Sequence, residues 1–174
     1  MWDVEDKSDY TDLKILMGKY SSPLFLFVYG FIHNKEVAEE IVSETFVRYW
    51  TGMDRIFHIK NVQAWLYVIA RNLSVSYLRE SGKVKMQSID DVPDILIKAS
   101  YSDGEQEETD AAGESLREAI SSLPPKCRMA FLLAKVNGLK HKEVARIMNI
   151  SELTVKNHIS YAIRKLSEKL KDTD

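Results

Sequence analysis

The sequence predicts an all-α protein made of two small helical domains joined by an acidic linker. Apolar residues recur at helical spacing through residues 13–79 and again through residues 144–170. Residues 83–113 carry three basic and eight acidic side chains without a sustained helical period, which is typical of a linker. Residues 114–170 carry eleven basic and five acidic side chains, in a chain of 174 residues whose net charge is −2. The expected domains are residues 1–82 and 113–174, with the linker at 83–112.

The first predicted helices occupy residues 13–51. Ser22 and Pro23 suit a helix cap and a first helical residue, so one helix is expected to begin there. Asn34 is expected to cap a further helix over residues 35–51. The residues of that helix expected to face inward are Val37, Ala38, Ile41, Val42, Thr45, Phe46 and Tyr49.

An acidic stripe marks the outer side of the helix at residues 35–51. Glu36, Glu40 and Glu44 follow one another at four-residue intervals and lead to Arg48. Such a stripe is either a solvated face or a surface that binds a partner with basic helices. The sequence leaves both interpretations open.

Another helix is expected over residues 61–79. Trp65, Asn72 and Arg79 are seven residues apart, so they lie along one line of this helix with Ser76 beside them. The line combines a stacking surface, an amide and a cation, which suits a nucleic-acid strand. A tryptophan at the start of an amphipathic helix is more often a core residue, so both interpretations stay open. The residues expected to face inward are Leu66, Ile69, Leu73 and Tyr77.

The segment at residues 139–170 has the spacing of a helix-turn-helix. A short first helix ends at Asn149, which suits a left-handed turn position, and Ser151 can cap the helix that follows. The expected buried positions are Val144, Ala145 and Met148 in the first helix, and Val155, Ile159, Ala162, Ile163, Leu166 and Leu170 in the second.

The outward face of the second helix is polar or amphipathic. It is either a solvated face or the face of a recognition helix, whose opening turns enter the major groove. The net charge of +6 on residues 114–170 favours contact with phosphate. The residues of this face are Thr154, Lys156, Asn157, Ser160, Tyr161 and Arg164.

Composition and motifs argue against several other classes of protein. The first ten residues are acidic and polar, unlike a signal peptide, and no apolar run is expected to approach the length of a membrane span. The single cysteine, Cys127, suits a buried position in a cytoplasmic protein. The four histidines are scattered, and the sequence has no phosphate-binding glycine loop or nucleophile elbow. We expect no enzyme activity, no cofactor, no metal and no membrane contact.

Two runs of sequence together resemble bacterial sigma factors of the extracytoplasmic-function class. AEEIVSETFVRYW followed by NVQAWLYVIARNLSVSYLR is similar to the second sigma region, and SLPPKCRMAFLLAKVNGLKHKEVARIMNISELTVKNHISYAIRKL is similar to the fourth. The resemblance implies a subunit that binds core RNA polymerase, melts and reads the −10 promoter element, and reads the −35 element. It leaves an anti-sigma factor open as a further partner.

The resemblance also assigns expected roles to single residues. One set would contact the polymerase: Glu40, Ser43, Glu44, Phe46 and Trp50. A second would engage the −10 strand, with one base extruded into a loop pocket: Arg48, Ile56, Asn61, Trp65, Arg71 and Asn72. Lys156, Asn157, Ser160 and Tyr161 match −35 reading positions, while Thr154, Lys140, Lys142, Arg146 and Arg164 would hold phosphates.

Lys140 departs from the family pattern, because Ser or Thr usually caps the first helix of the pair. Glu143 still occupies the acidic position of a capping box, so a weaker helix start is expected. Ser160 and Tyr161 also replace residues that are often larger or cationic, which leaves the −35 sequence undefined.

The linker can span two promoter elements only when extended. Elements one and a half duplex turns apart are ~50 to 60 Å from each other, whereas a coil of about 30 residues averages ~30 Å and reaches ~100 Å. The negative charge of the linker also discourages the free protein from binding DNA, so we expect the free chain to bind promoter duplex weakly. Two alternatives remain: an autonomous dimeric helix-turn-helix regulator, which would bind a palindrome without polymerase, and a protein-binding adaptor, which leaves the basic domain unexplained.

Overall fold

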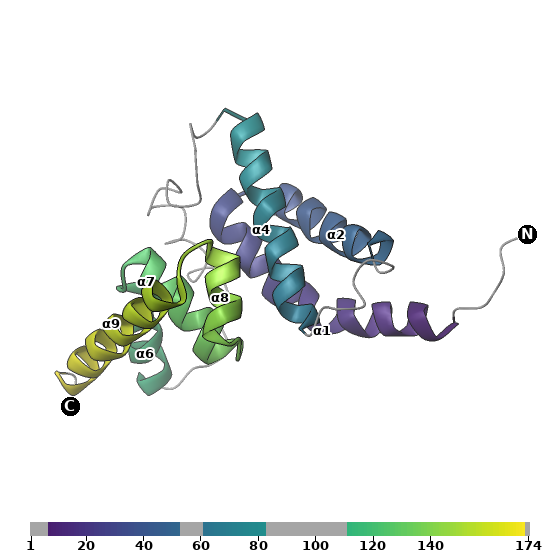
Figure 1. The fold of residues 1–174 in the computed structure, drawn as a ribbon. Helices are drawn as coiled ribbons and strands as arrows, with labels where there is room; N and C mark the ends of the chain where they lie inside the picture. Colours follow the sequence, from purple (N-terminus) through teal and green to yellow (C-terminus); the bar gives the residue numbers. More distant parts are fainter. Residues whose placement is uncertain (1–6, 53–60, 83–110, 173–174) are drawn as a thin grey trace, which may run out of the picture.

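The computed structural model describes residues 7–52, 61–82 and 111–172, and in these ranges every regular element is a helix (Figure 1). The N-terminal helices are α1 (Lys7–Ile32), α2 (Lys35–Thr51) and α4 (Val62–Glu80). The C-terminal helices are α6 (Ala111–Ser121), α7 (Pro125–Phe131), the π-helix η3 (Leu132–Val136), α8 (His141–Met148) and α9 (Glu152–Lys171). The all-α prediction is confirmed, whereas Ile56 and most of the predicted linker lie outside the described residues.

Helix α1 continues through Pro23, so the predicted helix start at that residue is wrong. Proline has no N–H for the helical hydrogen bond to the fourth preceding carbonyl, and its ring crowds that carbonyl. Leu24 and Val28, one turn apart on the same face, are completely buried. We attribute the continuity of α1 to this burial, which offsets the local cost of Pro23.

The segment Asp12–Ile32 of α1 is long and apolar enough to cross a membrane by length and composition. The expectation that no apolar run approaches that length is therefore wrong. A helix from the core of a soluble domain passes the same test, and α1 packs against both α2 and α4. Length and composition thus do not distinguish the two environments.

The N-terminal domain is a three-helix unit in which α1, α2 and α4 contact one another pairwise. Asn34 caps α2 as predicted, because its Oδ1 accepts a hydrogen bond of 3.1 Å from the Val37 amide. Six of the seven predicted inward residues of α2 are buried, and Val37 is half-buried. On α4 only Leu66 of the four residues predicted to face inward is buried. The buried face is rotated from the predicted one, and its residues are Leu66, Tyr67, Ala70, Ser74, Val75 and Leu78.

In the C-terminal domain α9 packs against α6, α7 and α8 (Figure 1). Asn149 adopts the predicted left-handed conformation with φ 56°, and the Ser151 hydroxyl accepts a hydrogen bond of 3.1 Å from the Thr154 amide. The predicted apolar face of α8 is buried, together with Ile147. On α9 the prediction holds for Val155, Ile159, Ala162 and Leu166. It is wrong for Ile163, which is 44% exposed, and Leu170 is only half-buried.

The two domains are in direct contact. Helix α4 lies against α8, and one continuous apolar cluster contains Leu66 and Tyr67 from α4 with Leu133 and Val144 from the C-terminal domain. The turn between η3 and α8 passes through Gly138, whose φ of 70° favours glycine. This turn places the start of α8 beside the start of α4.

Replacing Pro23 by alanine is expected to stabilise the protein. The substitution restores the missing N–H within α1, and we expect the free energy of unfolding to rise by about 2 kcal/mol in urea titrations. Pro125→Ala is the matched control, because Pro125 is the first residue of α7, where proline is well tolerated. A stability gain no larger for Pro23→Ala than for Pro125→Ala would contradict a strained but continuous α1.

Candidate nucleic-acid and polymerase interfaces

The polar face of α9 is open to solvent and forms a surface we term the duplex-reading face (Thr154, Lys156, Asn157, Ser160, Tyr161 and Arg164). Lys156, Asn157 and Ser160 are exposed, while Thr154 and Tyr161 are half-buried at its base. The Arg164 guanidinium lies 5.3 Å from the centre of the Tyr161 ring. This stacking restricts the Arg164 side chain before any ligand binds.

Basic residues at α8 lie next to this face. Lys140, Lys142 and Arg146 are all exposed. The Lys140 side chain has no oxygen to cap α8, but its backbone N–H donates to Glu143 Oε2 at 2.8 Å. The helix start therefore keeps only the acidic half of a capping box, as the departure from the family pattern predicts.

Arg128 does not contribute to this basic surface, although the charge count included it. Its side chain is completely buried, and Nη1 donates to the Ser121 carbonyl at 3.1 Å. Arg128 is therefore one of the eleven basic residues in the charge count that the structure removes from the exposed surface. The neighbouring apolar residues of α7, Cys127, Met129 and Ala130, were the sequence signal for a buried position.

On α4 the residues Trp65, Asn72 and Arg79 form one exposed line, which we term the Trp65 line. Trp65 is 37% exposed, so it is not a core residue. Beside it, Arg71 Nη1 donates to Asn72 Oδ1 at 3.0 Å, which fixes the amide and the guanidinium relative to each other. The structure thus exposes the ring and the amide along one line of α4, with Arg79 at its end and Arg71 hydrogen-bonded to the amide.

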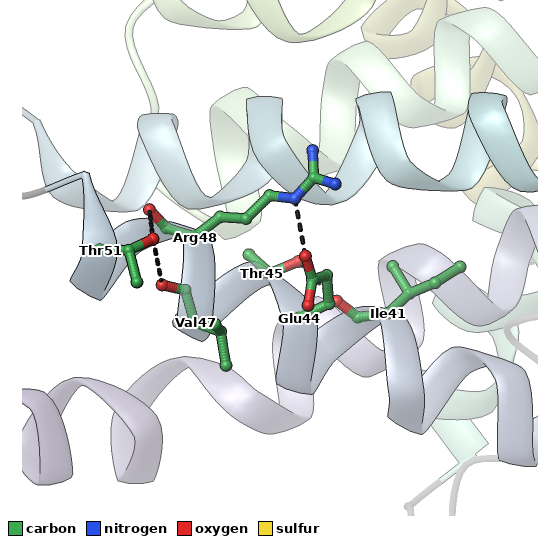
Figure 2. Close-up of polar contacts among 6 residues, drawn as sticks. All are labelled: Ile41, Glu44, Thr45, Val47, Arg48 and Thr51. Atoms are coloured by element: carbon green, nitrogen blue, oxygen red, sulfur yellow. Dashed lines mark hydrogen bonds and ion pairs between the residues drawn. The ribbon is translucent and has the colours of Figure 1, made fainter.

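The acidic side of α2 forms a shallow hollow lined by Glu36, Glu39, Glu40, Ser43, Glu44 and Val47, which we term the acidic face. Figure 2 shows Arg48 Nε donating to Glu44 Oε1 at 2.8 Å, one helical turn away. Both side chains are largely exposed, so this pair contributes little to stability and mainly orients Arg48.

Phe46 was expected to contact the polymerase, and the structure shows that this expectation is wrong. Its side chain is 3% exposed and belongs to the core of the N-terminal domain. It faces the opposite way from the acidic face because it follows the inward spacing of Ile41, Val42, Thr45 and Tyr49. Trp50 is half-buried, whereas Glu40, Ser43 and Glu44 are exposed.

Asn61 has a partner that sequence patterns did not indicate. Its Oδ1 accepts a hydrogen bond of 3.2 Å from the Ala64 amide and so caps α4. Its Nδ2 donates to Glu143 Oε1 at 2.8 Å, across 82 positions of sequence. A residue expected to contact the −10 strand is therefore bonded to the helix-turn-helix.

Cys127 is a buried residue of the α7–α9 packing, as predicted. Its Sγ lies 3.3 Å from His158 Nδ1, and burial raises the pKa of the thiol above its ordinary value. A thiol that resists ionisation is a poor nucleophile and a poor metal ligand. Among the described residues, no three His, Cys, Asp or Glu side chains gather as metal ligands.

Comparisons with known proteins agree with this arrangement. Residues 16–84 match the family model of sigma-70 region 2, and residues 113–166 match that of sigma-70 region 4. The chain is 31% identical over 147 residues to the ECF RNA polymerase sigma factor SigM of Bacillus subtilis, covering 84% of this chain and 88% of that protein. It is 28% identical over 173 residues to the ECF RNA polymerase sigma-E factor of Escherichia coli, covering 94% and 89%.

Two solved structures share the fold. The sigma factor RpoE of Bartonella quintana, solved in complex with the anti-sigma factor NepR, gives a TM-score of 0.60 at 24% identity and covers 92% of this chain and 97% of its own. CnrH, solved with the cytosolic domain of CnrY, gives a TM-score of 0.56 at 18% identity, with coverages of 96% and 92%. At these identities the likeness concerns the fold alone.

A region 2 followed by a region 4 defines a transcription initiation factor of the sigma-70 type. The chain belongs to the extracytoplasmic-function (ECF) class of these sigma factors. A protein of this class acts with core RNA polymerase and promoter DNA, and directs the polymerase to specific promoters.

Proposed function

We propose that this sigma factor divides promoter recognition between the duplex-reading face of α9 and the Trp65 line of α4. The observation that carries the proposal is the exposure of Lys156 and Asn157 in the opening turns of α9, beside the half-buried Tyr161. A recognition helix inserts these turns into the major groove. The −35 duplex is therefore the ligand of the C-terminal domain.

Within the −35 duplex, Lys156 contacts guanine and Asn157 contacts adenine. A lysine ammonium donates to the O6 and N7 acceptors of guanine, and an asparagine amide pairs with N6 and N7 of adenine. Ser160 and Tyr161 line the same face, and Tyr161 holds Arg164 by stacking. Thr154, Lys140, Lys142, Arg146 and Arg164 contact phosphates and set the position of the helix without reading sequence.

The N-terminal domain holds the melted −10 strand. An exposed Trp65 offers a stacking surface for an unpaired base, worth about 1 to 3 kcal/mol per base, which offsets much of the cost of unpairing. Arg71 and Asn72 follow on α4, and Arg48 on α2 is oriented by Glu44. Asn61 completes this surface in the proposal, together with Ile56, which lies outside the described residues.

The acidic face of α2 binds core RNA polymerase. Glu40, Ser43 and Glu44 are exposed in its hollow, and the exposed Val47 adds an apolar contact. Carboxylates around an apolar residue suit a basic helical partner. Trp50 extends the surface at the end of α2, whereas the buried Phe46 supports it from beneath.

The chain takes no chemical step of its own in this proposal, since the polymerase makes the phosphodiester bonds. It acts in the cytoplasm, where the polymerase and the DNA are. An anti-sigma factor is a further proposed partner. The alternative of an autonomous dimeric regulator is not favoured, because region 2 and region 4 occur together in this chain.

Substituting Lys156 by alanine is expected to weaken promoter-specific transcription. Loss of one base contact costs about 1 to 3 kcal/mol, so run-off transcript at low holoenzyme concentration should fall by a factor of about 5 to 150. Lys171→Ala is the control, because it removes an equal charge from the last residue of α9. Equal losses for both variants would show that Lys156 contributes only general charge, and would contradict its role as a base reader.

Substituting Trp65 by alanine is expected to impair promoter melting. Open-complex formation on duplex promoter, followed by permanganate reactivity of unpaired thymines, should fall about tenfold or more, and less on a template already unpaired at −10. Trp65→Phe keeps an aromatic face and should restore part of the reactivity. A loss of core polymerase binding by Trp65→Ala, measured without DNA, would contradict a role in holding the strand.

A further inference from the structure

One hydrogen-bonded pair joins the first turns of two helices from different domains. Asn61 caps α4 through Oδ1 and donates from Nδ2 to Glu143 Oε1 at 2.8 Å. The second oxygen of Glu143 accepts the Lys140 backbone N–H at 2.8 Å, at the start of α8. Each of the two side chains therefore makes one bond to its own helix start and shares one bond across the domain boundary.

The position of the Glu143 carboxylate strengthens this pair. It lies by the N-termini of both α4 and α8, where the unpaired N–H groups and the helix dipoles favour a negative charge. A second polar bond runs beside it, since Gln63 Nε2 donates to the Asn137 carbonyl at 3.2 Å. The N-terminal turn of α4 is thus fixed to the helix-turn-helix by two hydrogen bonds.

An open apolar pocket of about 320 Å³ lies at the edge of the domain contact, with walls from Phe27, Phe31 and Tyr67 on one side and Met129, Leu133 and Val136 on the other. Val136 is 63% exposed, so the pocket opens to solvent. The apolar contact between the domains is therefore incomplete at this edge, and the two hydrogen bonds add to it at the start of α4.

We propose that the Asn61–Glu143 pair is a latch that holds the free sigma factor closed and has to break before promoter recognition. The inference rests on the proposed function, since Asn61 borders the −10 surface and α8 adjoins the −35 surface. In the closed form both polar atoms of the Asn61 side chain are engaged. Trp65 lies one helical turn from Asn61, and Lys142 directly precedes Glu143, so the bond of 2.8 Å holds the two promoter-binding surfaces near each other. The two promoter elements are ~50 to 60 Å apart.

The test is the radius of gyration of the full-length chain in solution, measured by small-angle X-ray scattering. Asn61→Asp keeps an oxygen that caps α4 but places a second carboxylate against Glu143. The domains should separate, and the radius of gyration should rise by about 5 Å or more. Asn34→Asp is the matched control, because Asn34 caps α2 in the same way at an exposed position, and it should cause no change.

A double variant tests whether the pair itself is responsible. In Asn61→Asp combined with Glu143→Gln, the new glutamine can donate to the new carboxylate and still accept the Lys140 N–H. The closed radius should return. Gln63→Ala removes the neighbouring hydrogen bond without changing a helix cap, and it should separate the domains in part. This variant replaces Asn61→Asp in the test if circular dichroism shows that Asn61→Asp does not fold.

An unchanged radius for both Asn61→Asp and Gln63→Ala would overturn the latch, as would equal expansion in Asn34→Asp. Failure of the double variant to close would also overturn it. These outcomes do not depend on DNA. Failure of the proposed promoter contacts would instead appear as equal transcription by Lys156→Ala and Lys171→Ala, with the scattering results intact.

Discussion

The burial of one face of α4 is the constraint on which the other surfaces depend. Tyr67, Ala70 and Leu78 are at most 1% exposed against the N-terminal core, so the rotation of α4 about its axis is fixed. That rotation turns the Trp65 line outward and leaves the first turn of α4 against α8. The same packing holds α2 with Phe46 inward and its carboxylates outward. One buried helix face thus orients the Trp65 line, the acidic face and the contact between domains.

Local signals in the sequence were sufficient for the helix-turn-helix. The left-handed Asn149, the Ser151 cap and the buried residues of α8 each follow from a few neighbouring positions, and the structure confirms all three. The continuous α1 could not be predicted in this way. Pro23 is a strong local signal for a helix start, and only the tertiary burial of Leu24 and Val28 outweighs it.

The bond between Asn61 and Glu143 could not be predicted from sequence for a different reason. Both residues have a local task at a helix start, and that task alone accounts for their identity. Nothing in either segment indicates a partner 82 positions away. The sequence did suggest that a free chain binds promoter poorly, on the basis of linker length and charge. The proposed latch adds a further physical cause, since it joins the two domains through a bond of 2.8 Å.

The most direct test is run-off transcription by core polymerase, with and without this chain, on templates randomised in the upstream promoter region. We predict transcript only when both proteins are present, from templates enriched for two asymmetric elements about one and a half duplex turns apart. Lys156→Ala should relax selection in the upstream element alone. Transcription that does not depend on the chain, together with a symmetric palindromic footprint by the chain alone, would contradict the account and identify an autonomous regulator.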